Sequence, residues 1–326
     1  MRLRSEPVPS TPSRRGPSRV VGSSSSEPAI ALPPDLADEP RLLGLFDRDP
    51  ARRYLVVGAR PGVSGARSGD RVAAYGLLAD AYDIVHREKP YAAEARRVRA
   101  AAQRWATIRC RSLLDVACGS GRHLAEFVRW YDCTGLDASR SMLARARRRL
   151  PRVRWVRGRM EAFDLGREFD IVCCLFSAVG YVRSPAGLRQ TIAALARHTS
   201  PGGVVVVEPW LTPEVFREGR VHHLVARSEG TTVLRMNGAR RVRGRSVFDF
   251  HYLVGRDGAV RHAVERHDLG LFSRTQMEAA FRAAGLTPHF DPKGFATRRG
   301  LYVAVRPGVR AERRAAGRRR RRRRAA

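Results

Sequence analysis

The chain has 326 residues, 43% of them hydrophobic, so it can bury the core of one large domain or of two smaller ones. The formal charge of +31 suggests a polyanionic partner, but 60 of the 62 basic residues are arginines spread along the whole chain. We therefore expect no nucleic-acid partner. No run approaches the ~18 apolar residues of a membrane-spanning helix, and the N-terminus lacks an apolar signal segment, which argues against membrane spanning and secretion.

Composition divides the chain into three segments. Residues 1–71 are rich in Pro, Ser, Gly and Arg without sustained periodicity, and we expect a disordered N-terminal extension. Residues 310–326 hold ten arginines and are expected to form a disordered tail. Residues 72–309 are predicted to form the folded domain. The five cysteines form no C-x-x-C pair, so we expect free thiols in a reducing, cytoplasmic compartment.

Two helices are predicted at the start of the folded domain. The first begins at Val72 and places apolar residues on one face as far as Tyr82, and the second covers residues 91–105. Aromatic and polar residues, including His86 and Tyr91, surround a Pro-bearing turn between them. These side chains would lie over the loop that follows, although an ordinary helix pair with tyrosines at the edge of the core explains the pattern equally well.

The most informative stretch is residues 112–121, Ser-Leu-Leu-Asp-Val-Ala-Cys-Gly-Ser-Gly. Its apolar first half indicates a buried parallel strand. Ala117, Gly119 and Gly121 follow at a spacing of two, which leaves little side-chain bulk where the chain turns. A helix is predicted over residues 122–130, and its free N–H groups would point into the same turn. This loop is therefore predicted to bring its backbone close to a bound ligand.

Two acidic residues distinguish this loop from a dinucleotide-binding loop. The dinucleotide fingerprint has a third glycine where this chain has Leu124. Asp115 lies at the junction of strand and turn, where a carboxylate repels a pyrophosphate but attracts the ammonium group of a methionine moiety. Asp137 ends the next predicted strand, in position to accept hydrogen bonds from both ribose hydroxyls. The combination predicts S-adenosylmethionine as the ligand.

The chain then alternates helices and strands, as a doubly wound sheet requires. The predicted elements are a helix at 140–150 capped by Ser139, a strand at 153–156, a strand at 170–175, a helix at 188–198, a turn at 200–203 and a strand at 204–208. Met160 and Phe163 follow the third strand, where they would flank an adenine ring or join the core. Residues 176–181 follow the fourth strand, at the edge where such sheets bind ligands.

The alternation of helices and strands stops after Pro209. Antiparallel strands are predicted at 232–236, 246–254 and 260–268. Four side chains share one face of the second strand: Phe248, Phe250, Tyr252 and Val254. An insertion of residues 209–269 is too long for a connection, and we expect it to serve as a lid or as a homodimer surface.

The C-terminal part of the domain completes the sheet. A helix is predicted at 275–284 and strands at 286–290 and 301–305, the last antiparallel because the preceding loop is too short for a crossover helix. The insertion also carries His222, His223, His262 and His267. These lack cysteine or carboxylate partners at ligand spacing, so we interpret them as strand-face histidines and expect no metal.

Four motifs together resemble the class I methyltransferases that dimethylate the amino group of nucleotide-linked deoxysugars. They are Leu-Leu-Asp-Val-Ala-Cys-Gly-Ser-Gly, Phe-Ser-Ala-Val-Gly-Tyr, Pro-Gly-Gly-Val-Val-Val-Val-Glu-Pro-Trp and Leu-Phe-Ser-Arg-Thr-Gln. The resemblance runs from about Ala74 to Val305. It implies a seven-stranded, Rossmann-like α/β sheet with an antiparallel insertion. It also implies N,N-dimethylation of a dTDP-linked 3-amino-deoxysugar, with S-adenosylmethionine as the methyl donor.

The loop and the resemblance together assign the site residues. The cofactor is expected to contact Tyr91, Asp115, Ala117, Gly119, Gly121, Asp137, Met160 and Leu175. On the substrate side, the expected residues are Tyr82, Tyr181 near the amine, Trp210 in the sugar pocket, and Arg235 and Arg299 near the diphosphate, whose oxygens suit the planar forks of arginine. His86 stands where the family usually has a tyrosine, and Trp210 replaces a tryptophan pair.

Methyl transfer from a sulfonium requires alignment and an unprotonated acceptor nitrogen, but neither a metal nor a covalent intermediate. Tyr181 or His86 is expected to accept a hydrogen bond from the amine, and either residue, or water, would relay its proton. One alternative is methylation of another small molecule, or of RNA or protein held by the basic tail. The chain lacks the Asn/Asp-Pro-Pro-Tyr type of motif that is typical of base methylation. A second alternative is a non-enzymatic scaffold, which the presence of both Asp115 and Asp137 disfavours.

Overall fold

The structure is a computed structural model that describes residues 81–295, 297 and 299–308. The expectations for residues 1–71 and 310–326 lie outside the described residues. The helix predicted to begin at Val72 is described only in its last turn, residues 81–85. No described helix is both long and apolar enough to cross a bilayer.

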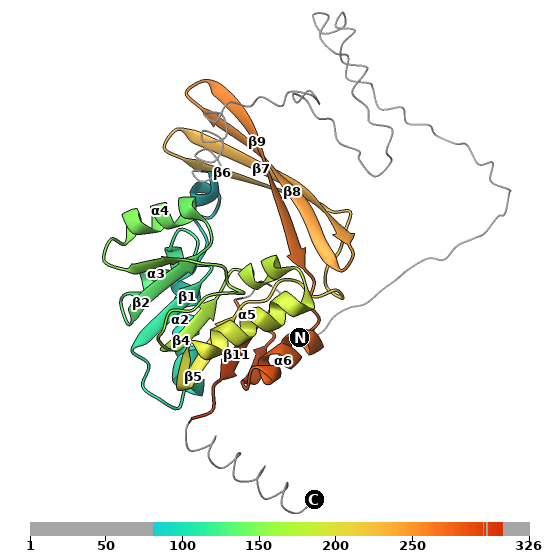
Figure 1. Cartoon of the computed structure of the whole chain (residues 1–326). Coiled ribbons are helices and arrows are strands. Elements are labelled where there is room, and N and C mark those ends of the chain that lie inside the picture. Colours follow the sequence, from blue (N-terminus) through green and yellow to red (C-terminus); the bar gives the residue numbers. More distant parts are fainter. Residues whose placement is uncertain (1–80, 296, 298, 309–326) are drawn as a thin grey trace, which may run out of the picture. The chain divides into compact units, whose positions relative to one another are not determined.

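Seven strands form one mixed sheet. They are β1 (Ser112–Val116), β2 (Asp132–Asp137), β3 (Arg154–Arg157), β4 (Phe169–Cys174), β5 (Thr199–Val207), β10 (Thr287–Asp291) and β11 (Leu301–Val305). Their order is β10-β11-β5-β4-β1-β2-β3. Of these strands, Figure 1 labels β11, β5, β4, β1 and β2. β1 to β5 pair in parallel, and β11 runs antiparallel to both of its neighbours. The predicted doubly wound sheet and its antiparallel last strand are confirmed.

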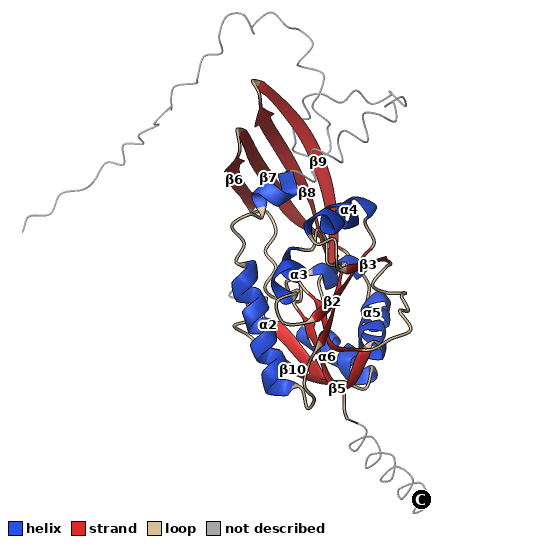
Figure 2. Ribbon diagram, turned by 90° about the vertical axis from the view of Figure 1, so that its left-hand side faces the viewer, coloured by secondary structure: helices blue, strands red, loops and turns tan. Residues whose placement is uncertain are grey.

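Helices cover both faces of this sheet. They are α2 (Tyr91–Trp105), α3 (Arg122–Phe127), α4 (Arg140–Arg149), α5 (Pro185–Arg197) and α6 (Arg274–Ala283), with the short 3₁₀ helix η2 (Ala178–Val182). α2 and α3 pack on one face, and α5 and α6 pack on the other (Figure 2). Cys173 and Cys174 are adjacent in β4 and enter the cores on opposite faces, as the alternation of a strand requires.

Local sequence explains where the helices begin. The Ser139 hydroxyl accepts a hydrogen bond from the backbone N–H of Met142 and so caps α4, as predicted. Ser273 and Gln276 form a capping box at the start of α6. α3 is shorter than predicted and ends at Phe127.

The turn predicted at residues 200–203 is an irregularity within β5. The pairing with β4 shifts from Phe169 opposite Thr199 to Ile171 opposite Val204, so the intervening residues of β5 bulge without leaving the strand. A Cβ on Gly203 would lie 2.6 Å from the carbonyl oxygen of Asp170. The glycine therefore lets two backbones pass closely at a point where the sequence alone suggested a turn.

The insertion forms a separate antiparallel sheet of four strands. They are β6 (Val221–Ser228), β7 (Thr231–Val242), β8 (Arg245–Arg256) and β9 (Ala259–Gly270), in the order β6-β7-β8-β9. β6 was not predicted, because its polar and apolar residues do not alternate. The predicted common face of β8 is confirmed, since Tyr252 and Val254 are buried together with Val233 of β7. This cluster also contains Ala81 and Val85 from the turn of helix before α2.

The strand order creates a switch point beside β1. The chain leaves β1 towards β2 and β3, and it later returns to β4 on the other side of β1. Open α/β sheets bind ligands outside the carboxyl ends of the strands at such a point. Here those ends lead into residues 117–121 after β1 and residues 175–177 after β4. The fold therefore places the predicted ligand loop at the expected position.

Candidate active site

The loop after β1 turns through three residues in the left-handed region. Ala117, Gly119 and Gly121 have φ angles of 60°, 56° and 75°. A Cβ added to Gly119 would meet no atom within 4 Å, so this glycine leaves open space above the loop. A Cβ on Gly121 would lie 2.7 Å from the Trp155 ring. Gly121 is thus required by backbone conformation and packing, and it does not line the cavity where it was predicted to contact the cofactor.

Two carboxylates flank this loop. Asp115 is 2% exposed, and burial together with the nearby charge of Asp137 raises its pKa to about 8. Asp137 accepts hydrogen bonds from the backbone N–H groups of Gly119 and Ser139, each at 2.8 Å. One bond reaches each carboxylate oxygen, so each oxygen keeps a lone pair for another donor. Burial raises the pKa of Asp137, although these backbone N–H groups oppose the shift.

Asp83 holds the segment before α2 over the loop. Its carboxylate accepts hydrogen bonds from Arg122 at 3.1 Å, from Arg149 at 3.1 Å and from the Ser120 hydroxyl at 3.2 Å. Burial alone would raise the pKa of Asp83, but the two guanidinium groups outweigh it and lower the pKa. The neighbouring Tyr82 is therefore fixed at the wall of the site by charged contacts from α3 and α4.

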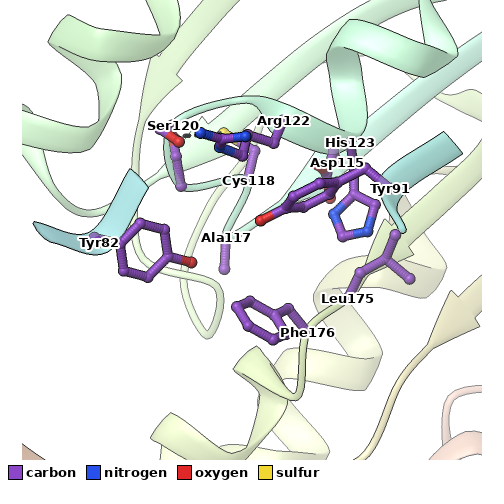
Figure 3. Close-up of a pocket in the computed structure, with 11 residues that line it drawn as sticks. Tyr82, Tyr91, Asp115, Ala117, Cys118, Ser120, Arg122, His123, Leu175 and Phe176 are labelled. Carbon is purple, nitrogen blue, oxygen red and sulfur yellow. Dashed lines mark hydrogen bonds between the residues drawn. The ribbon is translucent and has the colours of Figure 1, made fainter. Parts of the chain in front are cut away.

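Two connected hollows lie above the loop. The smaller is a recess of about 40 Å³ with Asp115 in its wall, and in Figure 3 the rings of Tyr82, Tyr91 and Phe176 surround Ala117. The larger is a cavity of about 570 Å³, within the range of small-molecule sites. The two hollows share five residues: Tyr82, Ala117, Gly119, Leu175 and Phe176.

The recess has a charged outer layer beside α2. Glu94 is 4% exposed and accepts a hydrogen bond from His123 Nε2 at 2.6 Å, and it also pairs with Lys89. The Lys89 ammonium lies 4.9 Å from the centre of the Tyr91 ring and 4.8 Å from that of Phe176. The start of α2 is thus joined to the loop helix α3 by a buried carboxylate.

His86 reaches the larger cavity from the segment before α2. Its ring packs edge-on against Tyr82 and Phe176, with centroids 4.5 and 5.1 Å away. Burial and the charges of Arg235 and Lys89 lower the pKa of His86 to about 4. At neutral pH the imidazole is therefore uncharged, and it can accept or donate a hydrogen bond without adding positive charge to the cavity.

Glu208 organises the opposite wall. This carboxylate is 1% exposed and accepts hydrogen bonds from the Phe176 N–H at 2.7 Å and from Arg299 at 3.3 Å. The Arg299 guanidinium also lies 4.9 Å from the centre of the Trp210 ring. Arg299 was predicted to lie in a loop near the diphosphate. The structure keeps it in the loop before β11 and places its side chain in the cavity wall, oriented by an ion pair with the buried Glu208.

The insertion supplies the remaining wall. Tyr181 of η2 and His267 of β9 are joined by a hydrogen bond of 2.6 Å between Oη and Nδ1. The His267 ring stacks on Phe248 with a centroid distance of 5.2 Å and an interplanar angle of 13°. Arg235 of β7 lies 4.3 Å from the centre of the Phe250 ring. The two arginines predicted to lie near a diphosphate therefore face one cavity, Arg235 from the four-stranded sheet and Arg299 from the loop before β11.

The structure brings most predicted site residues together. Eleven of them line the larger cavity, and eight of these are Tyr82, His86, Ala117, Gly119, Asp137, Met160, Leu175 and Tyr181. Trp210, Arg235 and Arg299 line the larger cavity, and Tyr91 and Asp115 line the recess. Phe163, considered as a second neighbour of an adenine ring, is instead buried in the core and stacks on His198.

Sequence reasoning missed Glu265 and the position of His267. Both line the larger cavity, whereas His222, His223 and His262 do not. The pairing register of β8 with β9 would have indicated both residues, because it sets Phe248 opposite His267 and Phe250 opposite Glu265. Among the described residues no group of three His, Cys, Asp or Glu side chains is arranged to hold a metal ion.

Comparisons with known proteins identify the family. A family model described as a methyltransferase domain matches residues 113–203. The chain is 43% identical over 231 residues to dTDP-3-amino-3,4,6-trideoxy-alpha-D-glucopyranose N,N-dimethyltransferase of Streptomyces venezuelae, covering 70% of this chain and 97% of that protein. It is 40% identical over 255 residues to dTDP-3-amino-3,6-dideoxy-alpha-D-glucopyranose N,N-dimethyltransferase of Streptomyces fradiae, covering 77% and 99%.

A solved structure agrees with these relatives. CalS10 with bound S-adenosylmethionine, an amino pentose methyltransferase from Micromonospora echinaspora involved in calicheamicin biosynthesis, is 40% identical to this chain. The TM-score is 0.63, and the match covers 71% of this chain and 96% of that chain. The chain therefore belongs to the dTDP-amino-deoxysugar N,N-dimethyltransferases, a family of S-adenosylmethionine-dependent class I methyltransferases.

Proposed function

We propose that this enzyme transfers two methyl groups from S-adenosylmethionine to the amino nitrogen of a dTDP-linked 3-amino-deoxysugar. One observation carries the proposal. A single cavity of about 570 Å³ connects the edge of the cofactor loop, at Asp137, with an aromatic wall and two arginines supplied by other segments. A sugar is flanked by such aromatic rings in many sites, and arginine forks suit a diphosphate.

The residues at the loop fit S-adenosylmethionine. The raised pKa of the buried Asp115 indicates a carboxylate that lacks a compensating cation, and the α-ammonium group of the methionine moiety would supply one. Asp137 retains a lone pair on each oxygen for ribose hydroxyls. Met160 and Leu175 offer apolar contacts, and Tyr91 closes the recess. When bound, the cofactor supplies an electrophilic methyl group on a sulfonium.

The protein's part in the reaction is to align the acceptor nitrogen and to keep it unprotonated. His86 is uncharged at neutral pH, so it does not repel the amine, and its ring nitrogen can accept a hydrogen bond. Tyr181 lies across the same cavity. Because Arg235 and Arg299 add positive charge nearby, they favour the neutral form of the amine as well as a diphosphate.

Asp115→Asn is expected to stabilise the ligand-free protein at pH 8. The pKa of Asp115 is raised to about 8 in the folded chain, against ~3.9 in an unfolded one, so the folded state binds a proton that the unfolded state lacks between these values. Stability therefore falls as the pH rises from ~4 to ~8, and an amide removes this loss. Urea denaturation should show that the free energy of unfolding of the wild type is ~2 kcal/mol or more lower at pH 8 than at pH 5. Asp115→Asn should lack this decrease.

The matched control is Asp132→Asn, an exposed carboxylate at the start of β2. It should keep the wild-type dependence of stability on pH. Asp115→Asn should also weaken binding of S-adenosylhomocysteine, because the ammonium loses its charged partner. If the free energy of unfolding of Asp115→Asn still falls with pH as it does in the wild type, Asp115 is not a buried, protonated carboxylate.

Asp137→Ala is expected to weaken cofactor binding by roughly 2 to 4 kcal/mol, because two hydrogen bonds to a charged group are lost. Calorimetric titration with S-adenosylmethionine measures the change. The deletion also removes the acceptor for Gly119 N–H, so circular dichroism and a thermal scan should accompany the titration. Unchanged affinity in a folded variant means that Asp137 does not hold the ribose.

Arg235→Ala is expected to raise KM for the amino sugar nucleotide, with little change in kcat and in cofactor affinity. A diphosphate contact remote from the nitrogen is made equally in the ground and transition states, so its loss of roughly 1.5 to 3 kcal/mol appears in KM. Arg299→Ala should act in the same direction. It also leaves Glu208 buried without its cation, so the double variant Glu208→Gln, Arg299→Ala separates binding from stability.

The assay compares methylation of a dTDP-linked 3-amino-deoxysugar, the free amino sugar and a structured RNA. Arg129→Ala is the control for loss of positive charge, because Arg129 is exposed and lies two residues beyond the end of α3. Only the nucleotide-linked sugar should respond to Arg235→Ala. Preference for the RNA, or an equal response of the free sugar, would reject the sugar nucleotide as substrate and favour methylation of a polyanion.

We further propose that the outer face of the four-stranded sheet forms a homodimer. The strand register places Val225, Leu234 and Leu253 in one row on this face. Val225 is 55% exposed, and Leu253 and Met236 are 41% and 43% exposed, which is unusual for neighbouring apolar side chains of a monomer. The inner face of the same sheet lines the cavity, so a partner on the outer face would brace the active-site wall.

Light scattering after size exclusion is expected to give twice the chain mass. Leu253→Glu should give a monomer, because it places a charge in the apolar row. Val128→Glu is the matched control, since Val128 is 38% exposed but lies beside α3. A wild-type monomer at micromolar concentration would rule out this assembly.

A further inference from the structure

A row of three polar side chains runs along the wall of the larger cavity. The Tyr181 hydroxyl lies 2.6 Å from His267 Nδ1, and His267 Nε2 lies 3.4 Å from the Glu265 carboxylate. The buried Nε2 has no hydrogen-bond partner of good geometry among the described residues, and the Glu265 carboxylate is its acidic neighbour. All three residues line the larger cavity.

The surrounding rings fix the orientation of His267. Phe248 stacks on its imidazole, and Phe250 meets it edge-on with a centroid distance of 4.6 Å. Two aromatic neighbours leave little freedom to flip the ring, so Nδ1 stays towards Tyr181 and Nε2 stays towards Glu265. The geometry therefore assigns one end of the imidazole to a hydroxyl and the other to a carboxylate.

This arrangement determines the tautomer. Burial opposes ionisation of Glu265, but its contact with His267 Nε2 and the positive charge of Arg235 outweigh it and lower the pKa of Glu265. Beside an ionised carboxylate, a hydrogen on Nε2 is attracted and a lone pair is repelled. In the neutral imidazole the hydrogen is then on Nε2, and Nδ1 presents its lone pair to Tyr181.

Tyr181 must consequently donate its own hydrogen to His267. Desolvation and the charge of Glu265 raise the pKa of Tyr181, so the phenol keeps this hydrogen. The lone pairs of its oxygen remain for the cavity. A hydroxyl whose hydrogen is already engaged can only accept a hydrogen bond from a ligand.

We propose that Glu265 and His267 are positioning residues that make Tyr181 an acceptor for the N–H of the substrate amine. The inference rests on the proposed function, which places the amine beside Tyr181. Accepting an N–H leaves the nitrogen lone pair free to face the methyl donor. A hydroxyl that donated instead would bind that lone pair and block the nucleophile.

A hydroxyl that can only accept a hydrogen bond also distinguishes substrate from product. A primary amine offers two N–H groups, a monomethylated amine offers one, and a neutral dimethylated amine offers none. Each of the first two forms can hydrogen-bond to Tyr181, whereas the doubly methylated form cannot. The three residues therefore favour retention of the amino sugar through two methyl transfers and its release after the second.

The first test needs no ligand. The full chain is labelled with ¹⁵N-histidine, and the His267 signals are assigned from their absence in His267→Asn. The nitrogen shifts of the uncharged ring should show hydrogen on Nε2, and Glu265→Ala should mix the two tautomers. Glu229→Gln, at the exposed turn between β6 and β7, should leave the signals unchanged. Hydrogen on Nδ1 in the wild type overturns the proposal.

The second test measures binding in the presence of S-adenosylhomocysteine, which prevents turnover. Wild-type protein should bind the primary amino sugar nucleotide roughly fivefold more tightly than its dimethylated form, the effect of about one hydrogen bond. The ratio should fall towards one in Tyr181→Phe and His267→Asn, and His289→Asn on β10 should preserve it. A ratio unchanged in Tyr181→Phe overturns the proposal. If no amino sugar nucleotide binds, the proposed function fails. The tautomer of His267 still shows whether the Tyr181 hydroxyl donates its hydrogen to His267.

Discussion

The buried carboxylate of Glu208 is the interaction on which the geometry of the site most depends. One oxygen accepts the N–H of Phe176, and the other accepts from Arg299 and from the Thr297 hydroxyl. An unpaired carboxylate in the interior costs several kcal/mol, so the ends of β4 and β5 and the loop before β11 are held together. Phe176 and Ser177 both have φ near +55°, a strained conformation that such contacts make stable.

The sheet edge alone would leave a bound ligand open to water on one side, and the insertion provides the missing wall. Contacts from three parts of the chain fix it there. Trp210 donates a hydrogen bond to Ser246 at 2.8 Å, and Tyr181 binds His267. Ala81, before α2, packs in the same core as Val233 and Tyr252 of the insertion. An acceptor in this cavity is thus aligned by segments that lie far apart in the sequence.

This construction explains what could be predicted from the sequence. The loop after β1, with Asp137 at the end of β2, follows from local backbone sterics, and it was predicted correctly. The strand β6 was missed because its polar and apolar residues do not alternate. It is a strand because it pairs with β7. Alternation places His267 on one face of β9, but only the docking of that face decides whether it meets solvent or a cavity. Gly121 is required by its positive φ and also by the Trp155 ring, and the second requirement is one that the loop sequence does not reveal.

The arginines around the site also show why net charge was a poor guide. Arg122 and Arg149 bind Asp83, and Arg299 binds Glu208, so much of the positive charge is already paired with acids. These ion pairs do not use up every donor. Arg299 contacts Glu208 and Ser177 through Nη1, and a guanidinium carries five N–H groups. The nitrogens that remain are held in a fixed plane by the buried carboxylate. In the proposed complex, a diphosphate would therefore meet an arginine that has already lost its side-chain freedom, which reduces the entropy cost of binding it.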